Sequence, residues 1–121
     1  MCIRDRLTST DQSAMERDLL IREKLEQVVL HYARTARAAG LDGVVCSPLE
    51  AGGVHEACGA DFLTVTPGVR FAGGEKGDQK RVTTPQEAKR LGSDYIVVGR
   101  PITAADDPVA AYERCLREFV G

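Results

Sequence analysis

Four residues in the second half of the sequence have side chains or backbone properties suited to binding an anion: Arg70, Gln79, Gly99 and Arg100. A guanidinium group can form two parallel hydrogen bonds with phosphate oxygens, and a glutamine amide adds a neutral donor. A glycine lets the backbone N–H approach a ligand closely. Each residue alone also fits a structural role, such as an ion pair or a solvated loop position. The hypothesis of an anion site therefore depends on all four meeting in space.

The elements around these residues predict such a meeting. Short segments rich in valine and isoleucine alternate with amphipathic segments, a pattern typical of a parallel sheet covered by helices. We predict strands in residues 41–47, 61–68 and 94–101. We predict helices in residues 24–39, 48–59, 85–92 and 108–120. Ligands of such folds bind at the carboxyl ends of the strands, and Arg70 and Arg100 both follow a predicted strand.

Local signals define where three of these helices begin. Each has a capping residue followed by proline at the first helical position, and two also have a glutamate suited to a capping box. The pairs are Ser47–Pro48 with Glu50, Thr84–Pro85 with Glu87, and Asp107–Pro108. In the last helix we expect one buried apolar stripe, made of Val109, Tyr112, Leu116 and Phe119.

The start of the chain does not fit the alternating pattern. Residues 7–10, "LTST", could be the tail of a fourth strand, but Arg4, Asp5 and Arg6 directly precede it. A buried parallel strand would not accommodate these charges cheaply. We therefore expect no strand in residues 1–6, which we interpret as a non-native start on a truncated reading frame. The domain is then expected to comprise residues 7–121.

Composition restricts the class of protein. The 121 residues are 43% hydrophobic and 28% charged, which is typical of one soluble domain. The net charge of −2 and the lack of a basic cluster give no reason to expect nucleic acid, and no apolar run suggests a membrane span. The four cysteines lack C-x-x-C spacing and are interpreted as reduced thiols of a cytoplasmic protein. His31 and His55 are interpreted as structural or solvated, so we expect no metal site.

Four separated blocks of the sequence resemble the second half of the orotidine 5′-phosphate decarboxylase family. They are "LTST", "LDGVVCS", "TPGVRFAGGEKGDQKRVTTPQEA" and "DYIVVGRPIT". The resemblance extends from about residue 7 to residue 121 and fixes the order and spacing of all four blocks. It implies an α/β fold, a partial TIM (β/α)8 barrel containing about strands five to eight with their helices.

The same resemblance implies an activity and a set of site residues. The family is a carboxy-lyase that converts orotidine 5′-monophosphate to UMP and CO₂ in pyrimidine synthesis, without metal or organic cofactor. The full-length parent is expected to be a cytoplasmic homodimer. The resemblance assigns substrate binding to Thr8, Arg70, Gln79, Gly99 and Arg100. Within this set, Gln79 and Arg100 would contact the 5′-phosphate directly.

The sequence departs from the family at the reacting end of the site. The family's alternating Lys and Asp set, with its D-x-K-x-x-D type motif, is not found. We therefore expect no catalytic residue in this chain and no decarboxylation by these 121 residues alone. Two alternatives remain. One is a non-catalytic phosphate-binding domain, and the other is a different sugar-phosphate barrel, such as a hexulose-phosphate synthase or an epimerase, which the Gly-Asp-Gln loop disfavours.

Overall fold

A parallel sheet of four strands forms the centre of the computed structural model, which describes residues 2–4, 9–73 and 82–121. The strands are β1 (Cys2–Arg4), β2 (Gly43–Val45), β3 (Leu63–Thr66) and β4 (Tyr95–Ile96), and they lie in the order β1-β2-β3-β4. In the register, Val44 lies beside Ile3 and Thr64, and Thr66 lies beside Ile96. Consecutive parallel strands joined through helices confirm the predicted α/β class.

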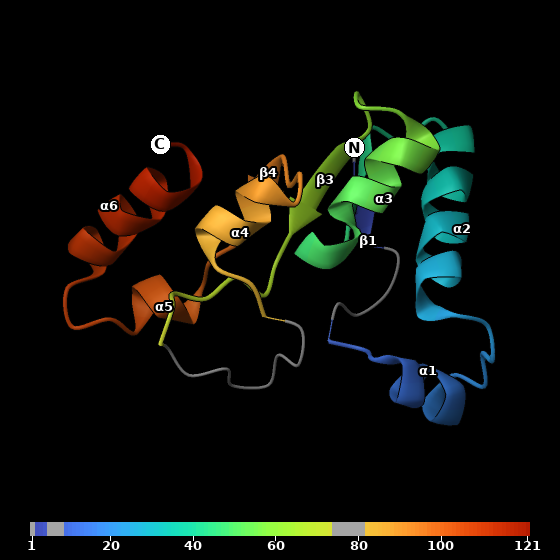
Figure 1. The fold of residues 1–121 in the computed structure, drawn as a ribbon, viewed down its shortest axis with the longest axis horizontal. Helices are drawn as coiled ribbons and strands as arrows, with labels where there is room; N and C mark the ends of the chain where they lie inside the picture. Colours follow the sequence, from blue (N-terminus) through green and yellow to red (C-terminus); the bar gives the residue numbers. More distant parts are fainter. Residues whose placement is uncertain (1, 5–8, 74–81) are drawn as a thin grey trace.

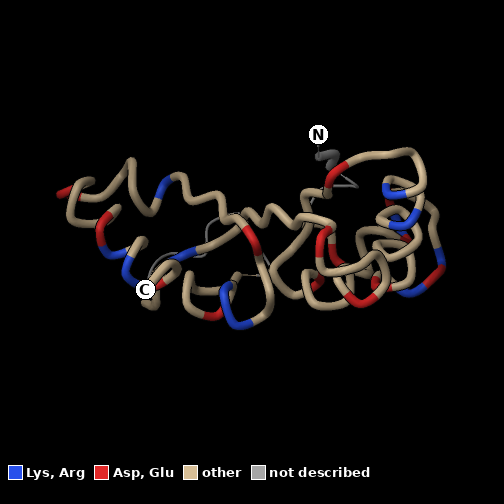
Figure 2. The backbone as a smooth tube through the Cα atoms, turned by 90° about the horizontal axis from the view of Figure 1, so that it is seen from above, with Lys and Arg blue, Asp and Glu red and all other residues tan. Residues whose placement is uncertain are grey.

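Six helices connect and follow these strands in the described residues. They are α1 (Gln12–Asp18), α2 (Leu25–Ala38), α3 (Pro48–Cys58), α4 (Pro85–Arg90), α5 (Arg100–Thr103) and α6 (Pro108–Phe119). Helices α2 and α3 lie side by side at one end of the molecule, and α4, α5 and α6 lie at the other end (Figure 1). Seen from above, the chain is elongated, with acidic and basic residues at both ends (Figure 2). None of the helices in the described ranges is both long and apolar enough to cross a membrane.

The predicted helix starts are confirmed. The Ser47 side chain accepts a hydrogen bond at the start of α3, and the Ser47 N–H donates to Glu50 Oε2 at 2.9 Å. The Thr84 N–H likewise donates to Glu87 Oε2 at 2.9 Å, while Thr84 Oγ1 accepts from the Glu87 N–H. These reciprocal bonds satisfy backbone donors that a helix leaves unpaired at its first turn. Local sequence therefore determines both starts.

The expectation that residues 1–6 contain no strand is wrong for Cys2–Arg4. This segment pairs in parallel with β2 as strand β1, at one edge of the sheet. An edge strand needs only backbone hydrogen bonds to one neighbour, and edges commonly include charged residues. The prediction had assumed a strand buried between two neighbours, and this assumption does not hold for an edge strand. The division of the chain between residues 6 and 7 stays a prediction.

Two predictions at the carboxyl-terminal end of the chain are also wrong. The strand expected over residues 94–101 is limited to Tyr95–Ile96, and Arg100 and Pro101 begin α5 instead. The stripe expected to be buried on α6 is largely exposed, at 68% for Val109, 54% for Tyr112 and 43% for Leu116. Among the described strands, β4 pairs only with β3. The side of α6 that has Val109, Tyr112 and Leu116 is therefore not covered by a further strand and helix of the described chain.

The core lies between α2, α3 and the sheet. It consists of Val29, Ala33, Ala36, Val44, Cys46, Val54 and Phe62. Phe62 heads the fully buried side chains by volume, and the Arg37 guanidinium lies 5.5 Å from its ring centroid. Arg37 also pairs with Asp61 at 3.1 Å, so one charged side chain covers the edge of the core. This core positions β2 and β3, and therefore the ends of these two strands.

Candidate functional site

The carboxyl ends of the strands lie along one edge of the sheet, as the α/β pattern predicts. The pairing of β2 with β3 extends past β2, because the Cys46 N–H donates to the Val65 carbonyl at 3.1 Å. The pairing of β3 with β4 extends in the same way, with the Val97 N–H donating to the Thr66 carbonyl at 3.0 Å. The segments that follow β3 and β4, which contain Arg70 and Arg100, therefore leave the sheet at the same edge.

Arg70 lies where the segment after β3 meets the segment before α4. Val69 and Thr83 form an isolated parallel bridge, and the Arg70 N–H donates to the Thr83 carbonyl at 2.9 Å. The half-buried Arg70 side chain folds back, with Nη1 donating to the Val69 carbonyl at 2.9 Å. The two sides of the glycine-rich segment are thus joined at its base. Gln79, which the sequence places inside that segment, lies outside the described residues, and so does Thr8.

Gly99 and Arg100 form the start of the short helix α5. The Gly99 carbonyl accepts hydrogen bonds from Ile102 at 2.9 Å and Thr103 at 3.1 Å. Arg100 is the first helical residue and is exposed. Among the described residues, no atom outside its immediate chain neighbours would lie within 4 Å of a Cβ at Gly99, so crowding by them does not require glycine there. The described residues leave this space open to a ligand that approaches the backbone.

Helix α6 links the two candidate segments. The Arg114 guanidinium lies 4.4 Å from the ring centroid of Phe71, the residue after Arg70, and pairs with Glu118 at 2.6 Å. Helix α6 also packs against α5, which begins at Arg100. The structure thus brings the segments of Arg70 and Arg100 onto the same helix. The side-chain meeting of Arg100 with Gln79 stays a prediction, since Gln79 is not among the described residues.

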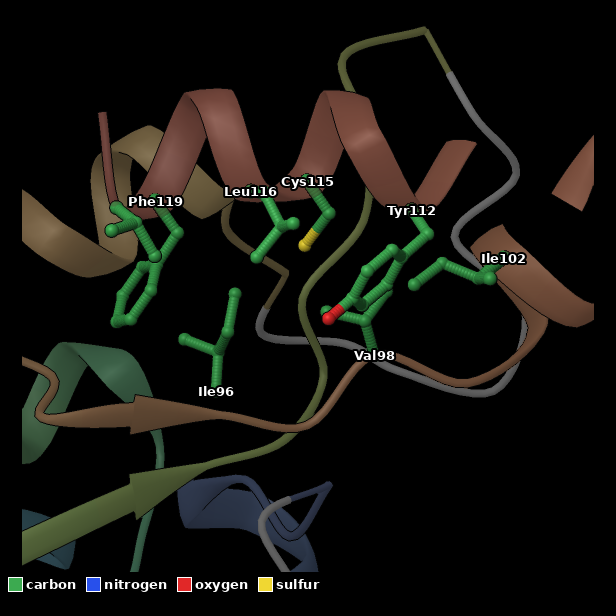
Figure 3. A pocket seen from close by; sticks show the side chains of 8 residues that line it. Ile96, Val98, Ile102, Tyr112, Cys115, Leu116 and Phe119 are labelled. Carbon is green, nitrogen blue, oxygen red and sulfur yellow. The ribbon is translucent and has the colours of Figure 1, made fainter. Parts of the chain in front are cut away.

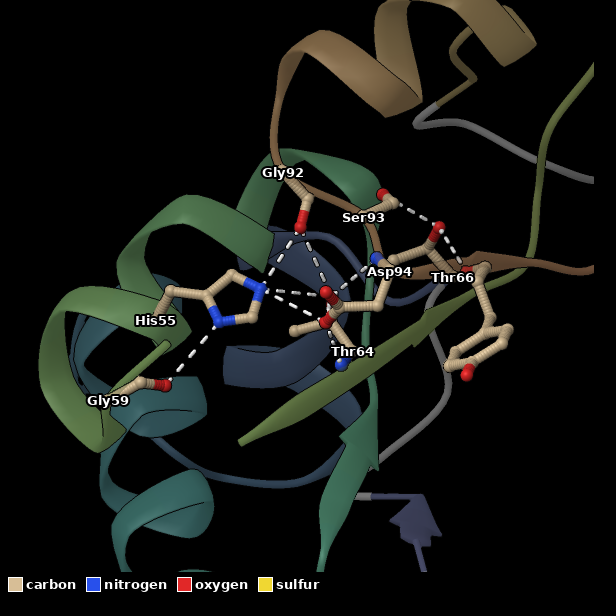
Figure 4. Close-up of polar contacts among 8 residues, drawn as sticks. His55, Gly59, Thr64, Thr66, Gly92, Ser93 and Asp94 are labelled. Carbon is tan, nitrogen blue, oxygen red and sulfur yellow. Dashed lines mark hydrogen bonds and ion pairs between the residues drawn. The ribbon is translucent and has the colours of Figure 1, made fainter. Parts of the chain in front are cut away.

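A network of polar contacts lies near the amino-terminal end of β3, away from the carboxyl ends of the strands (Figure 4). Asp94 Oδ2 accepts from the Thr64 N–H at 2.8 Å and from Thr64 Oγ1 at 3.0 Å, and it lies 3.1 Å from His55 Nε2. His55 Nε2 also lies 3.0 Å from the Gly92 carbonyl. The network joins α3, β3 and the turn before β4, which confirms the structural interpretation of His55. Sequence reasoning did not assign a role to Asp94, and its spacing from His55 gave no signal.

Two of the described cysteines, Cys58 and Cys115, have environments that favour the protonated thiol. Cys46, Cys58 and Cys115 are free, as predicted. Burial raises the pKa of the Cys58 thiol, an effect that Arg34 and Arg37 partly oppose. Burial also raises the pKa of Cys115, with a further contribution from Glu118. A raised pKa keeps a thiol protonated at neutral pH, whereas the reactive form is the thiolate. Residues 2–4, 9–73 and 82–121 also contain no group of three side chains that could hold a metal ion.

A match to a known family agrees with this arrangement. The family model described as "Orotidine 5'-phosphate decarboxylase / HUMPS family" matches residues 3–115. The chain belongs to this family. It is 54% identical over 115 residues to the orotidine 5′-phosphate decarboxylase of Geobacillus sp. (strain WCH70), which covers 95% of this chain and 48% of that protein. It is also 54% identical over 113 residues to the enzyme of that name from Enterococcus faecalis, covering 93% and 48% of the two chains.

The solved structures give the same result. The crystal structure of orotidine 5′-phosphate decarboxylase from Lactobacillus acidophilus superimposes with a TM-score of 0.80 at 43% identity, covering 99% of this chain and 49% of that one. The chain therefore spans about half the length of the relatives it matches. The predicted family is confirmed, as is an α/β fold with a parallel sheet. The assignment of this sheet to strands five to eight of a barrel stays a prediction.

Proposed function

We propose that this chain contributes phosphate recognition to an orotidine 5′-phosphate decarboxylase, which converts orotidine 5′-monophosphate to UMP and CO₂. The observation that carries the proposal is the 54% identity over 115 residues to a relative of that name. The common edge reached by the segments after β3 and β4 supports it, since barrel enzymes bind phosphate after their last two strands. We assign this sheet to about strands five to eight of a (β/α)8 barrel.

The binding residues are proposed to be Thr8, Arg70, Gln79, Gly99 and Arg100. Arg100 and Gln79 would bind the 5′-phosphate, because a guanidinium fork and an amide both donate hydrogen bonds to its oxygens. Gly99 offers an unobstructed backbone beside Arg100. Arg70 would exchange its present acceptor, the Val69 carbonyl, for an oxygen of the substrate. Each of these roles needs only a hydrogen-bond donor. The set is therefore suited to binding the substrate and not to breaking its bond to CO₂.

Catalysis would require residues beyond this set. Loss of CO₂ leaves a carbanion on the pyrimidine, which a lysine ammonium can stabilise and then protonate. The sequence lacks the family's Lys and Asp motif, so these 121 residues alone would bind the phosphate without releasing CO₂. Binding a group remote from the reacting carbon still serves catalysis, because it positions the substrate and excludes water. We propose a cytoplasmic, homodimeric parent enzyme that uses neither metal nor organic cofactor and binds neither nucleic acid nor membrane.

A second candidate is another sugar-phosphate enzyme of the same family, because the matching family model includes HUMPS in its description. Phosphate recognition by Arg100 would be common to both. The two candidates differ in the group attached to the phosphate, so a pyrimidine nucleotide and a sugar phosphate without a base distinguish them. A purely phosphate-binding domain without catalysis would bind both equally.

The test is titration of the ¹⁵N-labelled chain with UMP, ribose 5-phosphate and uridine, followed by amide NMR shifts. We expect UMP to bind most tightly and to shift the Gly99 and Arg100 signals. The Arg100→Gln variant should weaken UMP binding by about 10- to 100-fold, because a charge-assisted hydrogen bond contributes about 1.5–3 kcal/mol. The matched change Arg22→Gln, at an exposed arginine away from the carboxyl ends of the strands, should leave the affinity for UMP unchanged.

Three results would decide against parts of the proposal. Equal binding of uridine and UMP would exclude recognition through the phosphate. Equal binding of ribose 5-phosphate and UMP would favour the domain without pyrimidine specificity. Release of CO₂ from orotidine 5′-monophosphate by the purified chain would show that the catalytic group lies within these residues after all.

A further inference from the structure

Arg114 of α6 lies beside the segment that contains Arg70, one of the proposed binding residues. Its guanidinium is 4.4 Å from the ring centroid of Phe71, the residue after Arg70. Arg114 Nε also donates a hydrogen bond to Glu118 Oε1 at 2.6 Å. The guanidinium is thus bonded to its own helix and lies over a ring from a different part of the chain.

Helix stability alone does not account for the pair of Arg114 and Glu118. Ion pairs four residues apart stabilise a helix most when the acidic residue comes first, and here the arginine precedes the glutamate. The two side chains are 45% and 26% exposed, so competition with water weakens the pair further. A second effect of the pair is to restrict the side-chain conformations of Arg114, which keeps the guanidinium over the Phe71 ring.

The segment that contains Arg70 and Phe71 depends on contacts with other elements, because a glycine flanks it on each side. Gly68 and Gly73 have φ angles of +84° and +81°, in the left-handed region that glycine adopts without strain. Glycine also has more backbone freedom than any other residue. The direction of the chain between these two glycines is therefore not fixed by local backbone preference.

Contacts of its two neighbours hold Arg70 in place. Before it, Val69 pairs with Thr83 in a parallel bridge, and the Arg70 N–H donates to the Thr83 carbonyl at 2.9 Å. After it, the Phe71 ring lies against Arg114. The first contact joins Arg70 to the segment before α4, and the second joins it to α6.

Helix α6 also borders the segment around Arg100. Val98 and Ile102, two residues before and two residues after Arg100, line a cavity of about 230 Å³ together with side chains of α6 (Figure 3). Helix α5, which begins at Arg100, packs against α6 as well. The residues of α6 that point toward this cavity are Tyr112, Cys115, Leu116 and Phe119. A shift of the Arg70 segment relative to α6 would therefore also shift it relative to Arg100.

We propose that Arg114 is a positioning residue for Arg70: by holding Phe71 against α6, it keeps Arg70 at the distance from Arg100 that the substrate requires. The inference rests on the proposed function, since it takes Arg70 and Arg100 as binding residues. In this role Arg114 acts through Phe71 and does not contact the substrate. A cation over an aromatic ring at an exposed site changes an equilibrium constant by about 2- to 5-fold. Loss of the contact should increase local opening of the segment by that factor.

The first test is hydrogen exchange at the Arg70 amide of the whole chain, followed by NMR. This N–H donates to the Thr83 carbonyl, so its exchange rate reports opening of the segment. Arg114→Leu and Phe71→Leu should each increase the rate by about 2- to 5-fold, and the double variant by no more than either single variant. Arg114→Lys keeps a cation beside the ring and should restore most of the protection.

Two controls separate this role from a general loss of stability. Arg117→Leu removes the same charge from an exposed position of α6 and should leave exchange at Arg70 unchanged. The Thr64 amide, which donates to Asp94 at 2.8 Å, should exchange at the same rate in every variant. Unchanged exchange at Arg70 in Arg114→Leu, an equal increase in Arg117→Leu, or additive effects in the double variant would overturn the proposal. A parallel increase at Thr64 would also overturn it.

The second test is the affinity for UMP. Arg114→Leu should weaken UMP binding by about 2- to 5-fold. The same change should have no further effect in an Arg70→Gln chain and its full effect in an Arg100→Gln chain. Weaker binding in Arg100→Gln with unchanged binding in Arg114→Leu would overturn the positioning role and leave the proposed function intact. If the unchanged chain does not bind UMP, the proposed function fails, and the exchange rates decide whether Arg114 holds the Arg70 segment.

Discussion

Replacement of Asp94 by alanine should destabilise the chain more than any other change to an acidic side chain near the sheet. The carboxylate accepts two hydrogen bonds from Thr64, at 2.8 Å from the backbone N–H and 3.0 Å from Oγ1. It also lies 3.1 Å from His55 Nε2. Thr64 is fully buried, so water has poor access to the N–H that loses its acceptor. The alanine variant therefore leaves a buried donor unsatisfied.

The magnitude follows from these contacts. A hydrogen bond to a charged group contributes about 1.5–3 kcal/mol, and an unsatisfied buried donor costs about 1–3 kcal/mol. The Asp94 side chain is 31% exposed, which weakens its bonds through competition with water. Thr64 Oγ1 also retains a contact with the Gly92 carbonyl at 3.4 Å. We therefore expect Asp94→Ala to lower the free energy of unfolding by about 2–3 kcal/mol, a large part of the total for a small domain.

Urea unfolding followed by circular dichroism measures this change, at one chain concentration for all variants. Asp94→Asn keeps an oxygen that can accept from the Thr64 N–H, so its loss should be about half as large. The control Asp106→Ala, at an exposed acidic residue, should change stability by less than about 0.5 kcal/mol. A loss below about 0.5 kcal/mol in Asp94→Ala, or equal losses in the alanine and asparagine variants, would refute the reasoning.

Three further predictions concern the core, the sheet and one helix start. Phe62→Ala should lower the free energy of unfolding by about 3–5 kcal/mol in urea titrations, because the buried ring leaves a cavity. Gly43→Ala should cost about 1–3 kcal/mol, since the added Cβ would overlap the Leu63 carbonyl, whereas Gly99→Ala should be nearly neutral in the same assay. The hydrogen bond from the Thr84 N–H lowers the pKa of Glu87. A lowered pKa stabilises the fold at pH values above the unfolded glutamate pKa and loses this effect as pH falls through the folded value. The stability difference between wild type and Glu87→Gln should therefore shrink between neutral pH and pH of about 3, and a constant difference across that range would contradict it.

The sequence by itself determined the features that depend on neighbouring residues. The helices α2, α3, α4 and α6 were predicted from periodicity and capping residues, and the reciprocal bonds at Ser47 and Thr84 confirmed two starts. These signals succeed because a cap, a proline and the first turn lie within four residues. The family could also be predicted, because its blocks keep their order and spacing along the chain.

The tertiary structure decided what depends on distant partners. Asp94 bonds to Thr64, 30 residues away, and no local pattern marks that pair. The strand at Cys2–Arg4 forms because an edge needs only a backbone partner, which β2 supplies. Exposure of Tyr112 likewise depends on which element lies beside β4, and periodicity states only that α6 has an apolar side. Spacing along the chain fixes a helix face, whereas burial and hydrogen bonding between segments are fixed only when those segments pack.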